Sequence, residues 1–153
     1  MNMVTFLSCW SANMKCRYQI SEKWKTRDII LVMEAIEFAV EFWDIADPKS
    51  TITVKMLTGS PSDDCASADR IKNKRFELRL NHSRLKDSSE LIKSVMHEVT
   101  HIKQYIENGL RMGAKVARYE GEEYRDFDYW FTPWEMEARA MEQPMFHLFE
   151  ESN

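Results

Sequence analysis

The sequence predicts an α+β fold, in which a small antiparallel or mixed sheet of about three strands packs on helices. Apolar residues recur at helical spacing from Thr26 onward, and again over 88–108. Between these segments, 51–57 and 66–81 alternate apolar with polar residues, which is typical of half-buried strands. A third helical pattern near the end of the chain completes the predicted order of elements.

A chain of 153 residues fits one domain with one hydrophobic core. We expect that domain to cover 26–153. The segment 1–25 has no clear period and is expected to be a poorly defined N-terminal extension, in which Met14 is an alternative start of translation.

The first predicted helix begins at Thr26 and ends before Asp47-Pro48, because a proline disfavours helical backbone at the preceding residue. Its apolar residues cover most of the circumference, namely Ile29, Leu31, Met33, Ala35, Ile36, Phe38, Val40, Phe42, Trp43 and Ile45. Such a helix is a central packing element, and its aromatic side chains are interpreted as core residues.

The strand at 51–57 is β-branched, and a turn-rich loop follows it. The segment 66–81 is expected to be a hairpin with a short Asn73-Lys74 turn. The second strand of this hairpin has apolar residues on one face, namely Phe76, Leu78 and Leu80.

The helix at 88–108 has clear start and stop signals. Asp87 can cap its first turn, with Glu90 three residues later in the position of a capping box. Asn108-Gly109 closes it, since glycine suits the left-handed position after a last turn. Its apolar stripe consists of Leu91, Val95, Val99, Ile102 and Ile106.

Residues 97–101 of this helix read His-Glu-Val-Thr-His, which is the H-E-x-x-H pattern. Residues four apart share a helix face, so the imidazoles of His97 and His101 can bind one metal ion. Glu98 can reach a water held by that ion without being a ligand itself. Both histidines lie away from the centre of the apolar stripe, a placement that a purely structural helix does not need.

A catalytic zinc ion usually has three protein ligands and an open position for water. The third ligand is expected from the helix that begins at Thr132 and Pro133. Glu135 falls in the position where a capping box would use its carboxylate. We therefore choose Glu137 as the third ligand and keep Glu135 as the alternative. Pro144 is expected to end or bend this helix.

Other side chains are weaker candidates for the third ligand, namely Asp126, Asp128, His82 and His147. The segment 109–131 is irregular and rich in glycine, tyrosine and acidic residues, which is typical of a functional loop. A tyrosine of 119–129, or His147, is a candidate donor of a hydrogen bond to the transition state.

The formal net charge of −4 gives no basic field for phosphate backbones, so no nucleic-acid partner is expected. No apolar run approaches the length of a membrane span, and the first dozen residues lack the pattern of a secretory signal. Three cysteines without a C-x-x-C pair fit a reducing compartment. Together these features predict a cytoplasmic protein without a membrane partner.

The H-E-x-x-H motif, followed by a helix with Glu137-Ala138, resembles the minimal gluzincin-type zinc metallopeptidases. These include the ImmA/IrrE-type peptidases, a family of domains of unknown function, and small phage-encoded metallopeptidases. The resemblance implies a zincin-like fold in which the H-E-x-x-H helix faces a C-terminal helix that bears a glutamate. It also implies that His97, His101 and Glu137 bind zinc and that Glu98 is the catalytic base.

The resemblance covers roughly 26–145 and suggests a phage or bacterial origin. SprT-like proteases are similar in size, but they have a histidine as third ligand and a basic character, and this sequence shows neither. We therefore expect hydrolysis of a peptide or protein substrate by a zinc-activated water, with Glu98 transferring the proton to the leaving amine. An edge strand within 66–81 would hold the peptide. The alternative is a catalytically inactive zinc-binding structural or interaction protein.

Overall fold

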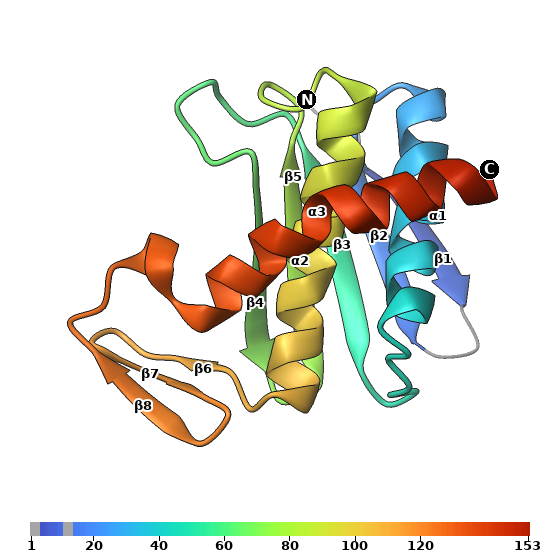
Figure 1. Ribbon diagram of the computed structural model, residues 1–153. Coiled ribbons are helices and arrows are strands. Elements are labelled where there is room, and N and C mark those ends of the chain that lie inside the picture. The colour runs from blue at the N-terminus through green and yellow to red at the C-terminus, as the bar shows by residue number, and fades with distance from the viewer. Residues whose placement is uncertain (1–3, 11–13) are drawn as a thin grey trace.

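The structure is a computed structural model that describes residues 4–10 and 14–153. This part of the chain has an α+β fold with three α-helices and two sheets (Figure 1). The expected fold class is therefore confirmed at this level. No helix in the described ranges has the length and apolar character that crossing a bilayer would need.

The larger sheet has five strands in the order β1-β2-β3-β5-β4. Its strands are β1 (Val4–Trp10), β2 (Lys15–Ser21), β3 (Thr51–Leu57), β4 (Ala66–Lys72) and β5 (Arg75–Asn81). The strands β2, β3 and β5 are parallel, whereas β1 and β4 pair antiparallel at the two edges. The predicted strand at 51–57 and the hairpin within 66–81 are thus confirmed.

The prediction of a poorly defined extension over 1–25 is wrong for the described residues of this segment. Strands β1 and β2 come from it and add to the three expected strands. Cys16, Tyr18 and Ile20 of β2 are buried in the core, and Met14 lies just before them with 1% of its surface exposed. Residues 1–3 and 11–13 lie outside the described residues.

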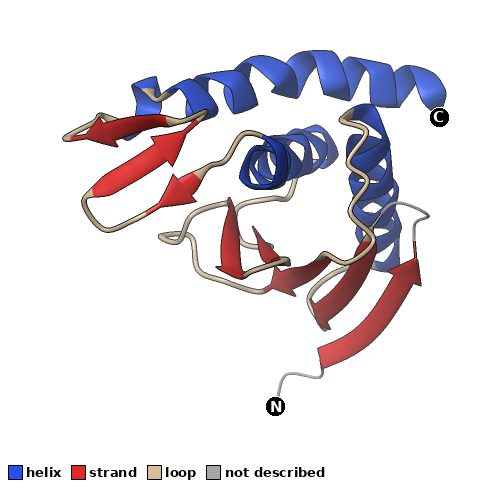
Figure 2. Cartoon of the chain, turned by 90° about the horizontal axis from the view of Figure 1, so that it is seen from below, coloured by secondary structure: helices blue, strands red, loops and turns tan. Residues whose placement is uncertain are grey.

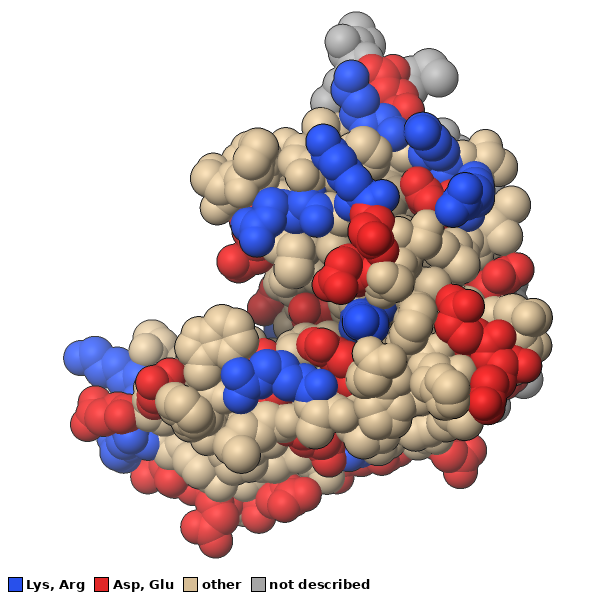
Figure 3. Space-filling view, turned by 45° about the horizontal axis from the view of Figure 1, so that its top comes forward, with Lys and Arg blue, Asp and Glu red and all other residues tan. Residues whose placement is uncertain are grey.

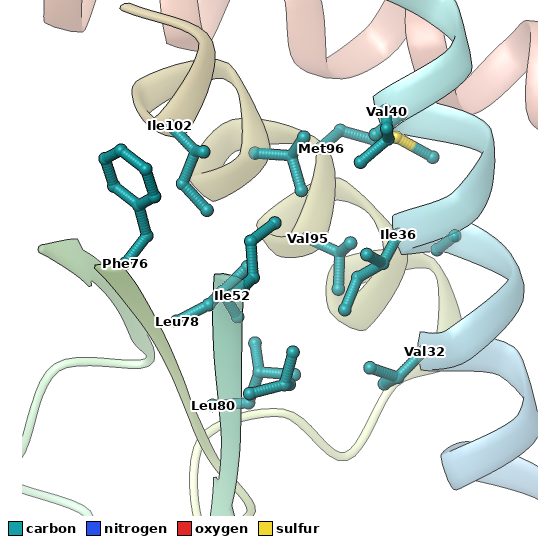
Figure 4. Packing of buried hydrophobic residues seen from close by; sticks show 14 of the residues in the cluster. Val32, Ile36, Val40, Ile52, Phe76, Leu78, Leu80, Val95, Met96 and Ile102 are labelled. Carbon is teal, nitrogen blue, oxygen red and sulfur yellow. The ribbon is translucent and has the colours of Figure 1, made fainter. Parts of the chain in front are cut away.

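Two helices, α1 (Thr26–Phe42) and α2 (Ser88–Glu107), cover the same face of the five-stranded sheet (Figure 2). The core lies between these helices and the inward side chains of the central strands (Figure 4). Both layers contribute apolar side chains to this core. Figure 4 labels ten of them, namely Val32, Ile36 and Val40 of α1, Val95, Met96 and Ile102 of α2, and Ile52, Phe76, Leu78 and Leu80 of the sheet.

The ends of α2 agree with the predicted signals. The Asp87 carboxylate accepts hydrogen bonds from the backbone N–H groups of Ser89 and Glu90. Asn108 follows the helix, and Gly109 has a φ of +67°, the left-handed conformation in which glycine carries no steric penalty. The helix is therefore fixed at both ends, which sets the position of the H-E-x-x-H residues in its middle.

The segment 109–131 is not the irregular loop that the sequence predicted. It contains an antiparallel three-stranded sheet of β6 (Arg111–Met112), β7 (Val116–Tyr119) and β8 (Glu122–Arg125). A 3-10 turn, Tyr129–Phe131, follows and leads into the last helix. We call 109–131 the arm. The Trp134 ring packs against Tyr119, Tyr124 and Phe127 of the arm, at centroid distances of 5.6, 5.2 and 5.6 Å.

The last helix, α3 (Pro133–Ser152), begins as predicted after Thr132 and crosses over α2 and α1 (Figure 1). The predicted capping box does not form, because the Thr132 hydroxyl instead donates to the Tyr129 carbonyl at 2.8 Å. The Glu135 carboxylate is thus not used at the helix start. Pro144 does not end the helix, which continues to Ser152.

Candidate metal site

His97 and His101 lie one turn apart on α2 and point their Nε2 atoms at one another, 3.1 Å apart. Their rings are nearly perpendicular, with an interplanar angle of 79°. The spacing of four residues produces this arrangement on any helix, so the predicted pairing of the two imidazoles is confirmed. His101 is buried and His97 is partly buried.

Glu135, in the first turn of α3, brings a carboxylate to both rings. Its Oε1 lies 3.0 Å from Nε2 of His97, and its Oε2 lies 3.1 Å from Nε2 of His101. The Glu135 residue is only 3% exposed. The described residues thus include a His97, His101 and Glu135 group that could hold a metal ion.

The spacing of these three groups fits a tetrahedral ion. Ligand bonds of roughly 2.0–2.1 Å place tetrahedral ligand atoms about 3.3 Å apart. The three atoms lie 3.0, 3.1 and 3.1 Å from one another, so they would have to move apart by only about 0.2–0.3 Å to hold a tetrahedral ion. In addition, Oε2 of Glu135 is buried and accepts no hydrogen bond in the part of the chain described. A cation would satisfy that oxygen.

The expectation that Glu137 faces the imidazoles is wrong. Its Oε1 accepts hydrogen bonds from Nζ of Lys103 at 3.2 Å and from Nε2 of Gln104 at 2.9 Å. Residues two apart on a helix project about 200° from each other, so Glu135 and Glu137 cannot face the same point. With the capping box absent, Glu135 is the carboxylate that reaches His97 and His101.

The weaker candidates lie elsewhere. The His82 ring packs edge-on against Trp24 at a centroid distance of 5.2 Å, and His147 pairs with Glu151 at 3.1 Å. The Asp128 carboxylate caps the 3-10 turn by accepting from the Trp130 backbone N–H. Asp126 has a φ of +49° in the loop after β8 and is not part of the group around the imidazoles.

Each imidazole is held from behind through its Nδ1 atom. Nδ1 of His97 lies 2.6 Å from Oε1 of Glu142, and Nδ1 of His101 lies 2.8 Å from Oε1 of Gln104. An acceptor at Nδ1 keeps the proton there and leaves Nε2 with a lone pair for a metal. The two acceptors therefore select the tautomer that a metal site needs.

The orientation of the Gln104 amide is itself fixed. Its Nε2 donates to the Trp134 carbonyl at 2.9 Å and to Glu137 at 2.9 Å. Because both of these partners are acceptors, the amide oxygen must be the atom that faces His101. Glu137, expected as a ligand, is instead an acceptor behind the site.

The sequence analysis did not identify Gln104 or Glu142. The spacing of both residues could have indicated them. Gln104 lies one turn after His101 and Glu142 lies two turns after Glu135, so each shares a helix face with a residue of the site. Neither position could be assigned without knowing which side of α3 faces α2.

The titratable groups of the site act on one another. Burial lowers the pKa of His97, but hydrogen bonds to Glu135 and Glu142 and the charge of Glu98 raise it to about 10. Burial raises the pKa of Glu135, whereas the two histidines lower it well below its usual value. The site is thus built to hold positive charge between the imidazoles and the carboxylate.

Glu98 is buried beside the two histidines, with 7% of its surface exposed. Burial raises its pKa to about 7, although the charges of His101 and His97 oppose that rise. Among the described residues, no hydrogen bond or ion pair holds its carboxylate, so it can exchange a proton with a group in the adjacent space. A carboxylate of this kind beside a metal site is suited to act as a general base.

The three groups open into a cleft of 860 Å³. One wall is the edge strand β4 and the loop before it, the floor is α2, and the other wall is formed by the arm and α3. The space-filling view shows the molecule hollowed, with acidic side chains gathered inside (Figure 3). Tyr129 lines this cleft, and burial together with the Glu135 charge raises its pKa well above the usual value, so the hydroxyl keeps its proton.

Comparison of the chain with protein-family models, with curated proteins and with solved structures gives no match.

We predict that Glu135→Ala abolishes binding of a divalent metal, whereas Glu137→Ala retains it, because only the Glu135 carboxylate lies against both Nε2 atoms. The two variants are matched, since each removes one carboxylate from the same helix. Elemental analysis after loading with zinc and desalting measures the bound metal. Full metal in Glu135→Ala and none in Glu137→Ala would reverse the assignment.

We predict that Gln104→Leu weakens metal binding by about 10- to 100-fold, since His101 loses the acceptor that selects its tautomer. Competition with a chelator of known affinity measures the change. Lys103→Met is the matched control, because it removes the other donor to Glu137 and no acceptor of His101, and it should leave the affinity unchanged. Equal loss of affinity in Lys103→Met and Gln104→Leu would show that the acceptor at Nδ1 of His101 is not what matters.

Proposed function

We propose that this protein is a zinc-dependent metallopeptidase with a zincin-like fold. The observation that carries the proposal is the convergence of two imidazole Nε2 atoms and one buried carboxylate, with Glu98 beside them and not part of the group. Two nitrogens and one oxygen at tetrahedral spacing are a typical donor set of catalytic zinc. Three protein ligands would leave a fourth position open toward the cleft.

The cleft supports a peptide as substrate. β4 is the last strand of the five-stranded sheet, so one of its edges has no neighbour within that sheet. That edge strand and the loop before it line the cleft beside α2. An extended peptide could pair with the free edge through main-chain hydrogen bonds, and this would lay its backbone over His97 and Glu98.

The reaction we propose is hydrolysis of an amide bond by water. Zinc, when bound, would acidify a water molecule and polarise the scissile carbonyl. Glu98 would accept a proton from the attacking water and donate it to the nitrogen of the leaving amine. His97, His101 and Glu135 would remain ligands throughout, held in place by Glu142 and Gln104.

Tyr129 is the tyrosine of 119–129 that we propose as the donor to the developing oxyanion. It lines the cleft together with His97, Glu98 and Glu135, whereas Tyr119 and Tyr124 have their rings packed against Trp134. A protonated phenol at this wall can donate a hydrogen bond to negative charge on the carbonyl oxygen.

We predict that Glu98→Gln keeps its zinc and loses turnover by about 10²- to 10⁴-fold, because the amide has the shape of the carboxylate without its basicity. Hydrolysis of an internally quenched peptide library, with elemental analysis of the same samples, measures both quantities. Glu107→Gln on the exposed end of α2 is the matched control and should behave as wild type. Wild-type rates in Glu98→Gln would exclude Glu98 as the base.

We predict that Tyr129→Phe lowers kcat by about 100-fold and leaves the zinc content unchanged, since only a hydroxyl that acts in the transition state is removed. Tyr124→Phe is the control, because its ring packs on Trp134 outside the cleft. Steady-state kinetics on one peptide separate kcat from KM. Equal kcat values in the two variants would rule out this role for Tyr129.

A further inference from the structure

One wall of the cleft carries large apolar side chains that are unusually exposed. Met112, Tyr129 and Trp130 are 44%, 48% and 58% exposed, and all three line the cleft. Single exposed apolar residues are ordinary on a protein surface, but several of them gathered in a concave site mark a place where a ligand is bound. These three residues are called the apolar wall below.

The apolar wall is held in a fixed shape. The guanidinium of Arg139 lies 4.9 Å from the centroid of the Trp130 ring and also donates to the Trp130 carbonyl. The Asp128 carboxylate accepts from the Trp130 backbone N–H at 3.1 Å. Met112 lies in β6 and is paired with Ala117 of β7. The exposure of these side chains is therefore built into the arm and its junction with α3.

The place of the apolar wall in the cleft indicates what covers it. Tyr129 lines the cleft together with His97 and Glu135. The opposite wall is the free edge of β4. An extended peptide paired with β4 would direct alternate side chains toward the helix-covered face of the large sheet, and the small sheet of the arm lies on that side (Figure 2). A side chain next to the scissile bond would then reach the apolar wall.

We propose that the apolar wall is a specificity subsite that binds one large apolar side chain, such as that of Phe, Leu or Met, within two residues of the scissile bond. This inference rests on the proposed peptidase function and adds the substrate class to it. The opposite wall, which lies wholly within the described residues, has no large apolar side chain in its lining, which consists of Asp64, Cys65, Ala66, Ser67, Ala68 and Asp69. Because the two walls differ in this way, a peptide with one large apolar side chain would have one preferred position along the cleft.

Burial of a large apolar side chain on this wall corresponds to a preference of about 10- to 100-fold in kcat/KM over alanine at the same position. Cleavage of a peptide library, with the sites read by mass spectrometry, should show enrichment of large apolar residues at one position. Trp130→Ser and Met112→Ser should each reduce the ratio of kcat/KM between Phe and Ala peptides by about threefold or more, because each leaves the other wall residues in place.

The matched control is Phe131→Ser. Phe131 follows Trp130, is 73% exposed and is not part of the cleft lining, so its removal should leave the Phe-to-Ala ratio unchanged. Circular dichroism of each variant verifies that the arm remains folded. An unchanged ratio in folded Trp130→Ser and Met112→Ser would overturn the subsite.

Hydroxamate binding separates this inference from the proposed function. Acetohydroxamate reports only whether the loaded zinc site has an open position, whereas a hydroxamate with a benzyl side chain should bind at least about tenfold more tightly if the subsite is present. Binding of both compounds with equal affinity would overturn the subsite and leave the zinc site standing. No binding of either compound to the zinc-loaded protein would overturn the open site and the subsite together.

Discussion

The contact between Glu135 and the two imidazoles is the interaction on which the site depends. It joins α2 to α3, two helices separated by the whole arm, and it places a carboxylate with 3% exposure against two nitrogen atoms. A buried carboxylate is costly unless a positive charge compensates it. Glu135 and Glu142 raise the pKa of His97 to about 10, so positive charge is favoured at the place where α2 and α3 meet.

The groups behind this contact tie it to the rest of the fold. Glu137 accepts from Gln104 and pairs with Lys103, whose ammonium lies 4.4 Å from the centroid of the Trp43 ring. The Trp43 Nε1 in turn donates to the Thr100 hydroxyl at 3.1 Å. This chain of contacts links α1, α2 and α3 within one turn of the histidines. The tautomer of His101 is thus set by side chains that never approach the cleft.

The sequence predicted those parts of the site that depend on one helix. The pairing of His97 with His101 follows from their spacing on one helix. The choice between Glu135 and Glu137 depends instead on how α3 is rotated about its axis relative to α2. These two glutamates flank opposite sides of the apolar stripe, so the hydrophobic pattern cannot distinguish them. Strand β2 was missed for a related reason, because its alternating residues pair with β3, a strand distant in sequence.

The arm connects the proposed substrate subsite to Glu135, the proposed metal ligand. Trp134 precedes Glu135 on α3 and is 1% exposed, since Tyr119, Tyr124 and Phe127 of the arm close around its ring. The first turn of α3 therefore carries both the Glu135 carboxylate, which faces the imidazoles, and the Trp134 ring, which packs against the arm. Because the apolar wall belongs to the arm and its junction with α3, a change in arm packing should alter both the ligand geometry and the side of the cleft that would meet a substrate.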